Sequence, residues 1–437
     1  MSDLVRKLTG ARLVDAMQLV SPGLVSSPYL HWDELRYKTP PPGLTSEEWW
    51  AGVKLARRSL LRELPLTDVS AAPFRYALPD EVLQAIETIG RDSSGHIGVN
   101  EAVTNSSTRD RYLVNSLIEE AITSSQLEGA STSRRVAKDM LRTGRQPKDR
   151  SERMIYNNYI AMRRVGELRN TAMTPELVCE LHRLVTEGTL DNPDSAGRLQ
   201  RPDEIRVAVY DDEDQRLHVP PAAEDLPRRL ELLCEFANGD LDSVYLPPVL
   251  RAVALHFMMG YDHYFEDGNG RTARALFYWS MLNQGYWLTE FLTISKILKE
   301  APAQYARSFL HTETDENDLT YFFIYQLRVL QRAISELHEY LSRKMLEVRE
   351  LQKALASRPG QFNHRQLALL EHASKTPGAK YTMQSHARSH NSSNETSRSD
   401  LLGLVALGLL TRERIGRSFY YTPVPGLSDK LQDLAAP

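Results

Sequence analysis

Apolar side chains recur every three or four residues along most of this chain, which is the pattern of helices that bury one face. The repeat begins at Thr45, where Thr45 or Ser46 can cap the first turn, and continues through Trp49 and Trp50. The same spacing predicts helices over 109–128, 149–170, 174–188, 223–239, 246–262, 270–285 and 317–356. Residues 1–45 lack this repeat and are predicted to be irregular. We therefore expect a mainly α protein.

A strand pattern interrupts the helical series once. The segments IRVAVY (205–210) and RLHV (216–219) are separated by the acidic stretch DDED, which favours a turn. These segments predict a β-hairpin. The first 350 residues are accordingly expected to be nearly all helix, with this one hairpin inserted.

The pattern changes in the last part of the chain, over residues 360–424. Three segments read as short helices: NHRQLALLEHA, YTMQSHARSHN and ETSRSDLLGLVALGLL. The segment RERIGRSFYYTP then reads as two short strands around residues 415–416. Three helices followed by a two-stranded wing predict a C-terminal winged helix-turn-helix.

Composition and charge limit the classes of function. A chain of 437 residues with 41% hydrophobic content can bury a large core in two or three domains. A net charge of −4 argues against a polycation that coats nucleic acid. Cys179 and Cys234 lie in apolar helical contexts and are expected to be buried small hydrophobic residues rather than a disulfide or a reactive thiol. No Cys/His cluster has zinc spacing. Without a recognisable signal peptide or an apolar run of membrane length, we expect a cytoplasmic protein with no membrane partner.

The segment HYFEDGNGRTARALFYW, which begins at His263, concentrates the candidate chemistry. Gly268 and Gly270 allow the backbone to turn sharply and to bring its N–H groups against a ligand. A strong helix-forming run follows, so the loop ends at a helix N-terminus, where an anion is favoured. Arg271 and Arg274 are three residues apart and share one helix face. Two guanidiniums beside free N–H groups indicate a di- or triphosphate site.

Two further residues convert this anion site into a candidate enzyme. A carboxylate beside a phosphate site needs a bridging cation, so Asp267 is expected to hold Mg²⁺. The imidazole of His263 has a pKa suited to taking a proton at neutral pH. A DGNG turn, a lone histidine or two arginines on a helix are each common without such a role. Their combination within twelve residues indicates an enzyme that acts on a nucleotide.

The same segment resembles the signature of the Fic (Fic/DOC) family, HPFxDGNGRxxR. The matching positions are His263, Phe265, Asp267, Gly268, Asn269, Gly270, Arg271 and Arg274. Tyr264 departs from it, because the family usually has proline there, and this difference affects the expected loop geometry more than the chemistry. The resemblance implies a Fic-type helical bundle that transfers AMP from ATP to a Ser, Thr or Tyr hydroxyl of a protein and releases pyrophosphate.

The resemblance also implies a role for each matching residue. These roles are general base for His263, core anchor for Phe265, Mg²⁺ ligand for Asp267, orientation of the α-phosphate for Asn269, backbone N–H donation for Gly268 and Gly270, and binding of the β- and γ-phosphates for Arg271 and Arg274. The hairpin at 205–219 falls where the family has a flap, which would pin an extended target segment by strand addition. Leu217 and His218 match flap positions near the nucleotide.

The helix that ends in TSSQLEGA carries a second resemblance. Gly129 is a natural C-terminal cap, whereas a carboxylate at Glu128 opposes the helix dipole unless a cation faces it. Ser124, Glu128 and Gly129 match the family's inhibitory motif, S/T-x-x-x-E-G/N. The resemblance implies that Glu128 pairs with Arg274 and occupies the space that the γ-phosphate needs. Some inhibited members also use this glutamate to remove AMP, and the sequence leaves that activity open.

The C-terminal module carries only a slight excess of positive charge. Residues 361–437 contain nine lysines and arginines against six aspartates and glutamates. Five arginines fall on the expected recognition helix and wing, where DNA phosphates would be contacted: Arg388, Arg398, Arg412, Arg414 and Arg417. We favour contact with a protein over contact with DNA. A DNA-binding transcriptional regulator with an accessory Fic domain is the alternative function.

These expectations divide the chain into five parts. They are an N-terminal helical region (1–108), the inhibitory helix with the helix that follows it (109–145), a Fic core (146–316), a helical linker (317–359) and the winged helix (360–437). The expected partners are ATP, Mg²⁺ and a target protein, with modification of the chain itself and a homodimer left open. A phosphate donor other than ATP also stays open, because no residue identifies the base.

Overall fold

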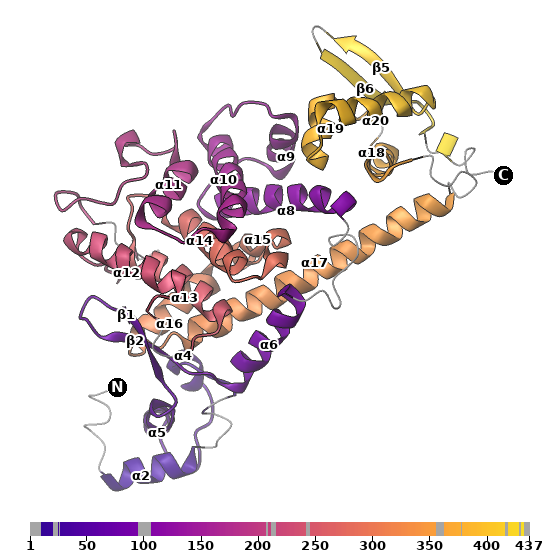
Figure 1. Cartoon of the computed structure of the whole chain (residues 1–437). Helices are drawn as coiled ribbons and strands as arrows, with labels where there is room; N and C mark the ends of the chain where they lie inside the picture. The colour runs from indigo at the N-terminus through magenta and orange to yellow at the C-terminus, as the bar shows by residue number, and fades with distance from the viewer. Residues whose placement is uncertain are drawn as a thin grey trace.

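The computed structural model describes residues 10–20, 25, 27–94, 106–206, 209–210, 216–241, 245–354, 362–376, 378–415, 418–427 and 430–431. Its fold is mainly α, as predicted, and the strands of the described residues form three two-stranded sheets. Figure 1 shows a helical body, a small group of N-terminal helices below it and a C-terminal module at the far end of the long helix α17. Among the described helices, none has both the length and the apolarity that crossing a bilayer requires.

The N-terminal region is helical, so the prediction that residues 1–45 are irregular is wrong. It contains α2 (Gly10–Leu19), α4 (Trp32–Leu35) and α5 (Ser46–Arg58), which share a small core of their own. Thr45 caps α5 as predicted, because Glu48 N donates to its hydroxyl at 3.2 Å while Thr45 N donates to the Glu48 carboxylate at 2.9 Å. Helix α2 packs against α5, and this tertiary contact stabilises it. The apolar spacing within α2 alone was too weak to predict the helix.

A hairpin that the sequence pattern did not predict follows α5. Strands β1 (Arg62–Thr67) and β2 (Pro73–Tyr76) pair antiparallel, so the expectation of a single hairpin in the first 350 residues is wrong. The period-two signal is short and contains Pro65, which weakens it. A distant segment supplies the missing support: Arg75 N donates to Asn317 O at 2.9 Å, and Leu319 N donates to Arg75 O at 2.8 Å.

Two central helices, α13 (Pro248–Asp262) and α14 (Asn269–Asn283), form the middle of the body. Both helices are buried nearly all round, because neighbouring elements pack against them on several sides. The other helices of the body are α6 (Asp80–Ser94), α8 (Ser106–Leu127), α9 (Arg134–Thr143), α10 (Arg150–Glu167), α11 (Pro175–Thr186), α12 (Leu226–Asn238), α15 (Ile294–Glu300), α16 (Pro302–Thr314) and α17 (Thr320–Ala354). Short 3₁₀ turns occupy Leu168–Asn170, Pro193–Ser195, Ala223–Asp225 and Trp287–Phe291.

The hairpin predicted at 205–219 is present in the described residues as β3 (Val209–Tyr210) and β4 (Arg216–His218). Cys179 and Cys234 form no disulfide, and Cys234 is buried as predicted, whereas Cys179 is only partly buried. The first half of α17 is more than a linker, because Leu319 to Leu341 contribute buried side chains to the main core. The five-part division of the chain stays a prediction.

The C-terminal module contains the three predicted helices and the predicted hairpin. They are α18 (His364–Lys375), α19 (Met383–His390), α20 (Asn394–Ala406), β5 (Leu410–Ile415) and β6 (Ser418–Pro423), and they enclose a separate apolar cluster. The assignment of this module as a winged helix-turn-helix stays a prediction.

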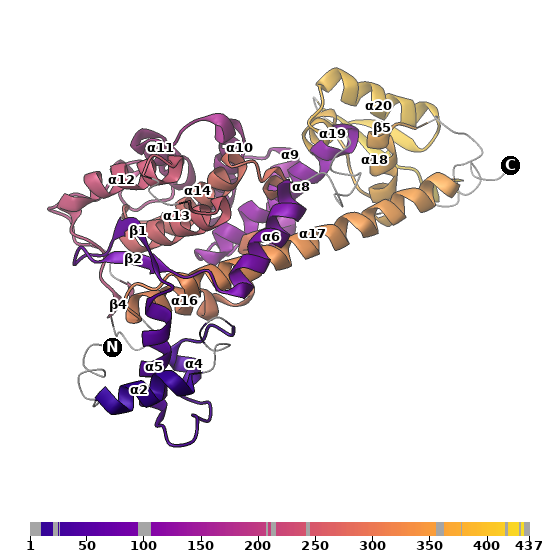
Figure 2. The same cartoon turned by 60° about the horizontal axis from the view of Figure 1, so that its bottom comes forward.

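The module contacts the body mainly through α19, which packs against α8 and α9. In Figure 2 these three helices lie side by side. The guanidinium of Arg388 fills the space beside Gly144, where a Cβ would lie 1.3 Å from Nη1. Arg388 therefore lies at the junction with the body, whereas the sequence placed it among the residues that face a nucleic acid. Arg417 lies outside the described residues.

Candidate active site

The loop between α13 and α14 has a left-handed residue at each end. His263 ends α13 with φ of +47°, and Gly268 precedes α14 with φ of +83°. Glycine suits this second position for two reasons, because φ is positive and a Cβ would lie 2.5 Å from Thr186 Cγ2. At His263 the same backbone region costs roughly 1–2 kcal/mol, so the surroundings must hold it there.

An asparagine closes the loop from inside. The Asn269 amide donates to Phe265 O at 2.7 Å, and Phe265 N donates to the Asn269 amide oxygen at 3.0 Å. The sequence prediction gave this side chain to the α-phosphate of ATP, and that contact stays a prediction. In this structure both ends of the amide support the backbone of the loop.

His182 on α11 supports the loop from outside, and the sequence analysis missed it. Gly197 N donates to Nδ1 at 2.9 Å, so Nε2 carries the hydrogen and donates to Asp267 O at 2.8 Å. The ring stacks on fully buried Phe265 with centroids 3.7 Å apart. Burial lowers the pKa of His182 to about 4, so the ring is neutral at pH 7. A histidine within the apolar face of the helix predicted at 174–188 was the available signal.

The imidazole of His263 is set up to accept a proton. Its Nδ1 lies 2.6 Å from the carbonyl oxygen of Gly260, and a carbonyl can only accept a hydrogen bond. Nδ1 therefore carries the hydrogen, and the lone pair is on Nε2. Burial lowers the pKa of His263 below its usual value, although the bond to Gly260 opposes this shift. The ring is consequently neutral at pH 7, which is the state that a general base requires.

Tyr264, where the family usually has proline, takes part in a buried polar cluster. Its hydroxyl donates to Asp262 Oδ2 at 2.6 Å, and Arg229 Nη2 lies 2.7 Å from Asp262 Oδ1. Arg206 donates to the carbonyl oxygens of His263 at 2.9 Å and Asp262 at 2.7 Å. We infer that these contacts hold the strained end of α13 in place of the rigidity that proline would give.

The N-terminus of α14 contains unused hydrogen-bond donors. Arg271 is 1% exposed, and its Nη1 donates to Val185 O at 2.6 Å. Its Nε and Nη2 have no hydrogen-bond partner among the described residues. Asp267 lies 3.9 Å from Nη2 with a side chain that is 46% exposed. Buried donors without partners are costly, so this corner fits the oxygens of a phosphate, with Asp267 near enough to share a bound Mg²⁺.

Arg274 is held by the end of α8. Its Nη2 lies 2.8 Å from Glu128 Oε1, and its Nε donates to the Ser124 hydroxyl at 2.9 Å. Gly129 ends this helix with φ of +91°, in the left-handed form that a glycine cap adopts. A Cβ on Gly270 would lie 2.2 Å from Glu128 Oε1, so the carboxylate lies directly against the first turn of α14. Glu128 thus occupies space at the helix end that favours an anion.

The contact of Leu217 and His218 with a nucleotide stays a prediction. His218 is buried, with Nε2 2.7 Å from Tyr261 O and Nδ1 2.6 Å from Glu313 Oε2. Both ring nitrogens are therefore engaged with the body in this structure. The side chain of Leu217 lies outside the described residues, although its backbone belongs to β4.

Comparison with known proteins agrees with this geometry. The model of the family described as Fic/DOC matches residues 172–281, which run from just before α11 to near the end of α14. Within this segment the chain is similar to the Fic/DOC family. The match includes His182 and the whole loop, whereas Glu128 lies outside it.

Two relatives and two solved structures extend the comparison. Both relatives are named Protein adenylyltransferase Fic. The relative from Nematostella vectensis is 32% identical over a segment that covers 27% of this chain and 25% of the relative. The relative from Drosophila willistoni is 33% identical over a segment that covers 25% of this chain and 20% of the relative. The chain therefore spans a quarter or less of these curated relatives. A Fic family protein from Desulfovibrio desulfuricans G20 aligns with a TM-score of 0.49 and 18% identity over 80% of this chain and 98% of its own. A Fic-1 fragment from C. elegans aligns with a TM-score of 0.45 and 22% identity, over 61% of this chain and 72% of the fragment.

Proposed function

We propose that this chain is a self-inhibited protein adenylyltransferase that transfers AMP from ATP to a Ser, Thr or Tyr hydroxyl of a protein. One observation carries the proposal: a neutral imidazole with its lone pair on Nε2 lies at the end of α13, and a buried guanidinium with unused donors lies in the first turn of α14, at the other end of the same loop. The names of the two curated relatives add support for the type of reaction.

The proposed reaction is a displacement at the α-phosphorus. Nε2 of His263 takes the proton of the target hydroxyl as its oxygen forms a bond to that phosphorus. The bond from the α-phosphorus to the bridging oxygen breaks, and pyrophosphate leaves. Arg271 and the backbone N–H groups at the start of α14 hold the negative charge. Mg²⁺ at Asp267 would neutralise the phosphate oxygens.

Glu128 is proposed as the brake on this reaction. Its carboxylate holds Arg274 and lies against Gly270, so a γ-phosphate would meet like charge and occupied space. ATP would then bind in a posture that does not react. Removal of AMP from the target, modification of the chain itself and homodimer formation stay open predictions.

Transfer of radiolabelled AMP tests both roles. We expect Glu128→Gly to label itself or proteins of a lysate more strongly than wild type, and we expect His263→Ala in the Glu128→Gly form to lose labelling while it still binds ATP. Glu231→Ala is the matched control, because Glu231 is an exposed carboxylate paired with Arg228 on α12 and lies outside the site. Equal labelling by wild type and Glu128→Gly would refute the brake, and labelling that survives His263→Ala would remove His263 as the base.

The alternative of a DNA-binding regulator has less support. Arg388 lies at the junction with the body, and Arg365 forms a bidentate ion pair with Asp400 inside the module. Exposed arginines remain at Arg398 on α20 and at Arg412 and Arg414 on β5. A salt-dependent gel shift with the full chain distinguishes the two functions, because DNA binding through phosphates weakens steeply as salt rises.

A further inference from the structure

Two adjoining cavities lie among α8, α9, α17 and the C-terminal module, beside the contact that α19 makes with α8 and α9. Their volumes are about 680 Å³ and 460 Å³, within the range of small-molecule sites. Both are lined by Asn115 of α8, Lys138 and Arg142 of α9, and His372 of α18. We call this pair of cavities the junction groove. The junction groove contains no residue of the loop between α13 and α14 (residues 263–268), which we call the catalytic loop under the proposed function. Glu128 does not line the groove either.

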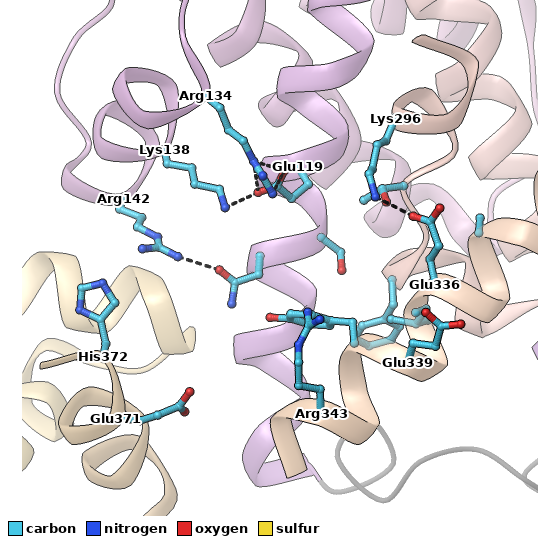
Figure 3. Close-up of a pocket in the computed structure, with 17 residues that line it drawn as sticks. Glu119, Arg134, Lys138, Arg142, Lys296, Glu336, Glu339, Arg343, Glu371 and His372 are labelled. Atoms are coloured by element: carbon cyan, nitrogen blue, oxygen red, sulfur yellow. Dashed lines mark hydrogen bonds and ion pairs between the residues drawn. The ribbon is translucent and has the colours of Figure 1, made fainter. Parts of the chain in front are cut away.

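Helix α9 presents a stripe of positive charge to the groove. Arg134, Lys138 and Arg142 are spaced by four residues, so they share one face of the helix. Figure 3 shows all three side chains extending toward α8. Arg134 Nη2 lies 2.8 Å from Glu119 Oε2, Lys138 pairs with the same carboxylate, and Arg142 donates to Asn115 at 2.9 Å. Glu119 therefore pairs with two of these three cations, and the third is bonded to a neutral amide.

The two cavities differ in charge and polarity. Four lysines and arginines line the smaller cavity against a single aspartate, Asp139. These cations are Arg135, Lys138, Arg142 and Lys380. The larger cavity is nearly balanced, and Phe291, Leu337 and Tyr340 give it an apolar wall. The groove thus has a cationic end at the C-terminal module and a partly apolar end against α17.

We propose that the junction groove binds a small phosphate-bearing molecule. Its phosphates would lie in the smaller cavity between α9 and Lys380, where the hydroxyls of Ser385 and Ser389 also line the wall. Its apolar or planar part would lie in the larger cavity beside Phe291 and Tyr340. The cavity volumes favour a molecule of nucleotide size over a folded partner.

The position of the groove links this site to the brake. Asn115 and Glu119 belong to α8, and the same helix leads to Glu128, about 20 Å beyond Asn115 and about 14 Å beyond Glu119 at roughly 1.5 Å per residue. A ligand that contacts α8, α9 and the module together would hold the brake helix against the body. Binding itself does not depend on the proposed function, but this consequence for the brake does.

Calorimetric titration of the full chain with sodium tripolyphosphate tests the site. We expect wild type to bind it, and the double variant Lys138→Ala, Arg142→Ala to bind this site at least about tenfold more weakly. Lys380→Glu tests the opposite wall from an exposed position, so it should fold normally and also lose at least about tenfold in affinity. Any tripolyphosphate that binds beside the catalytic loop is identified by its loss in Arg271→Ala.

Arg228→Ala is the matched control, because Arg228 is an exposed arginine on α12 that lines neither cavity. Unchanged binding in both groove variants, or an equal loss in Arg228→Ala, would overturn the proposal. A comparison of AMP with inorganic phosphate tests the apolar end: tighter binding of AMP that is lost in Lys380→Glu supports it, and equal binding overturns that part. Labelling with AMP from ATP is measured separately, so failure here leaves the proposed function intact.

Discussion

Two carboxylate–arginine pairs flank the catalytic loop, and they differ in burial and in the number of contacts. Asp262 is 2% exposed and receives Arg229 through two nitrogens and the hydroxyl of Tyr264. Glu128 is 28% exposed and has the single cation Arg274 among the described residues. A carboxylate closed in by three donors can only be scaffold. A carboxylate that still reaches solvent can be displaced by another anion. We therefore call Asp262–Arg229 the scaffold pair and, under the proposed function, Glu128–Arg274 the switch pair.

The largest expected effect comes from breaking the scaffold pair. Asp262→Ala leaves the largely buried Arg229 guanidinium without its carboxylate partner, so we expect a loss of about 3–5 kcal/mol in the free energy of unfolding. Urea denaturation measures this loss. Glu231→Ala, which removes an exposed pair, should stay within about 0.5 kcal/mol of wild type. A loss below about 1 kcal/mol in Asp262→Ala would show that the buried pair is not a support.

The switch pair should respond to a ligand instead. If a phosphate replaces the Glu128 carboxylate at Arg274, ATP with Mg²⁺ stabilises Glu128→Gly by about 2.7 kcal/mol when present at a hundred times its Kd. Thermal unfolding at increasing ATP measures this shift. Wild type should gain less at each concentration, because its own carboxylate competes for the arginine. Equal gains in the two proteins would show that Glu128 and the nucleotide do not compete.

Acidification should lower the free energy of unfolding through His182, which supports the loop. Burial lowers the pKa of His182 to about 4, so the unfolded chain binds more protons than the folded chain between pH 6.5 and 4. Stability is therefore full above pH 6.5 and falls as pH decreases through this window. His182 accounts for about 2 kcal/mol between pH 6.5 and 5. Urea unfolding of wild type and His182→Gln at these two pH values measures it, and parallel slopes would contradict it.

The smallest expected effect concerns the end of the brake helix. Gly129 has φ of +91° with no atom within 4 Å of an added Cβ, so Gly129→Ala strains only the backbone. We expect a loss of about 1–2 kcal/mol from this strain, together with weaker inhibition, because Glu128 immediately precedes it. Stability and AMP labelling are measured side by side on this variant. Gly285→Ala has a similar φ of +86° and equally open surroundings, so it should lose stability without gaining activity.

The catalytic loop was readable from the sequence because its parts are consecutive. Glycines, carboxylate, imidazole and arginines within twelve residues determine a turn, a helix start and a charge without any distant contact. The central helices were readable for the same reason, since their apolar repeats are long and regular. The C-terminal helices and hairpin followed from equally local patterns.

The features that the sequence analysis missed depend on distant contacts. Strands β1 and β2 are supported by the segment before α17, more than two hundred residues away along the chain. The link from His182 to Asp267 joins α11 to the loop before α14, two segments that the sequence pattern treats separately. The contact of His218 with Glu313 on α16 likewise joins segments far apart along the chain. Local spacing cannot reveal which distant group completes such a contact.

One measurement tests the central claim most directly: a crystal structure of the Glu128→Gly form soaked with ATP and Mg²⁺. The account predicts a triphosphate at the N-terminus of α14, in contact with Arg271 and Arg274, with Nε2 of His263 facing the α-phosphate. A structure with no triphosphate at that helix end, or with the imidazole packed away from it, would contradict the account.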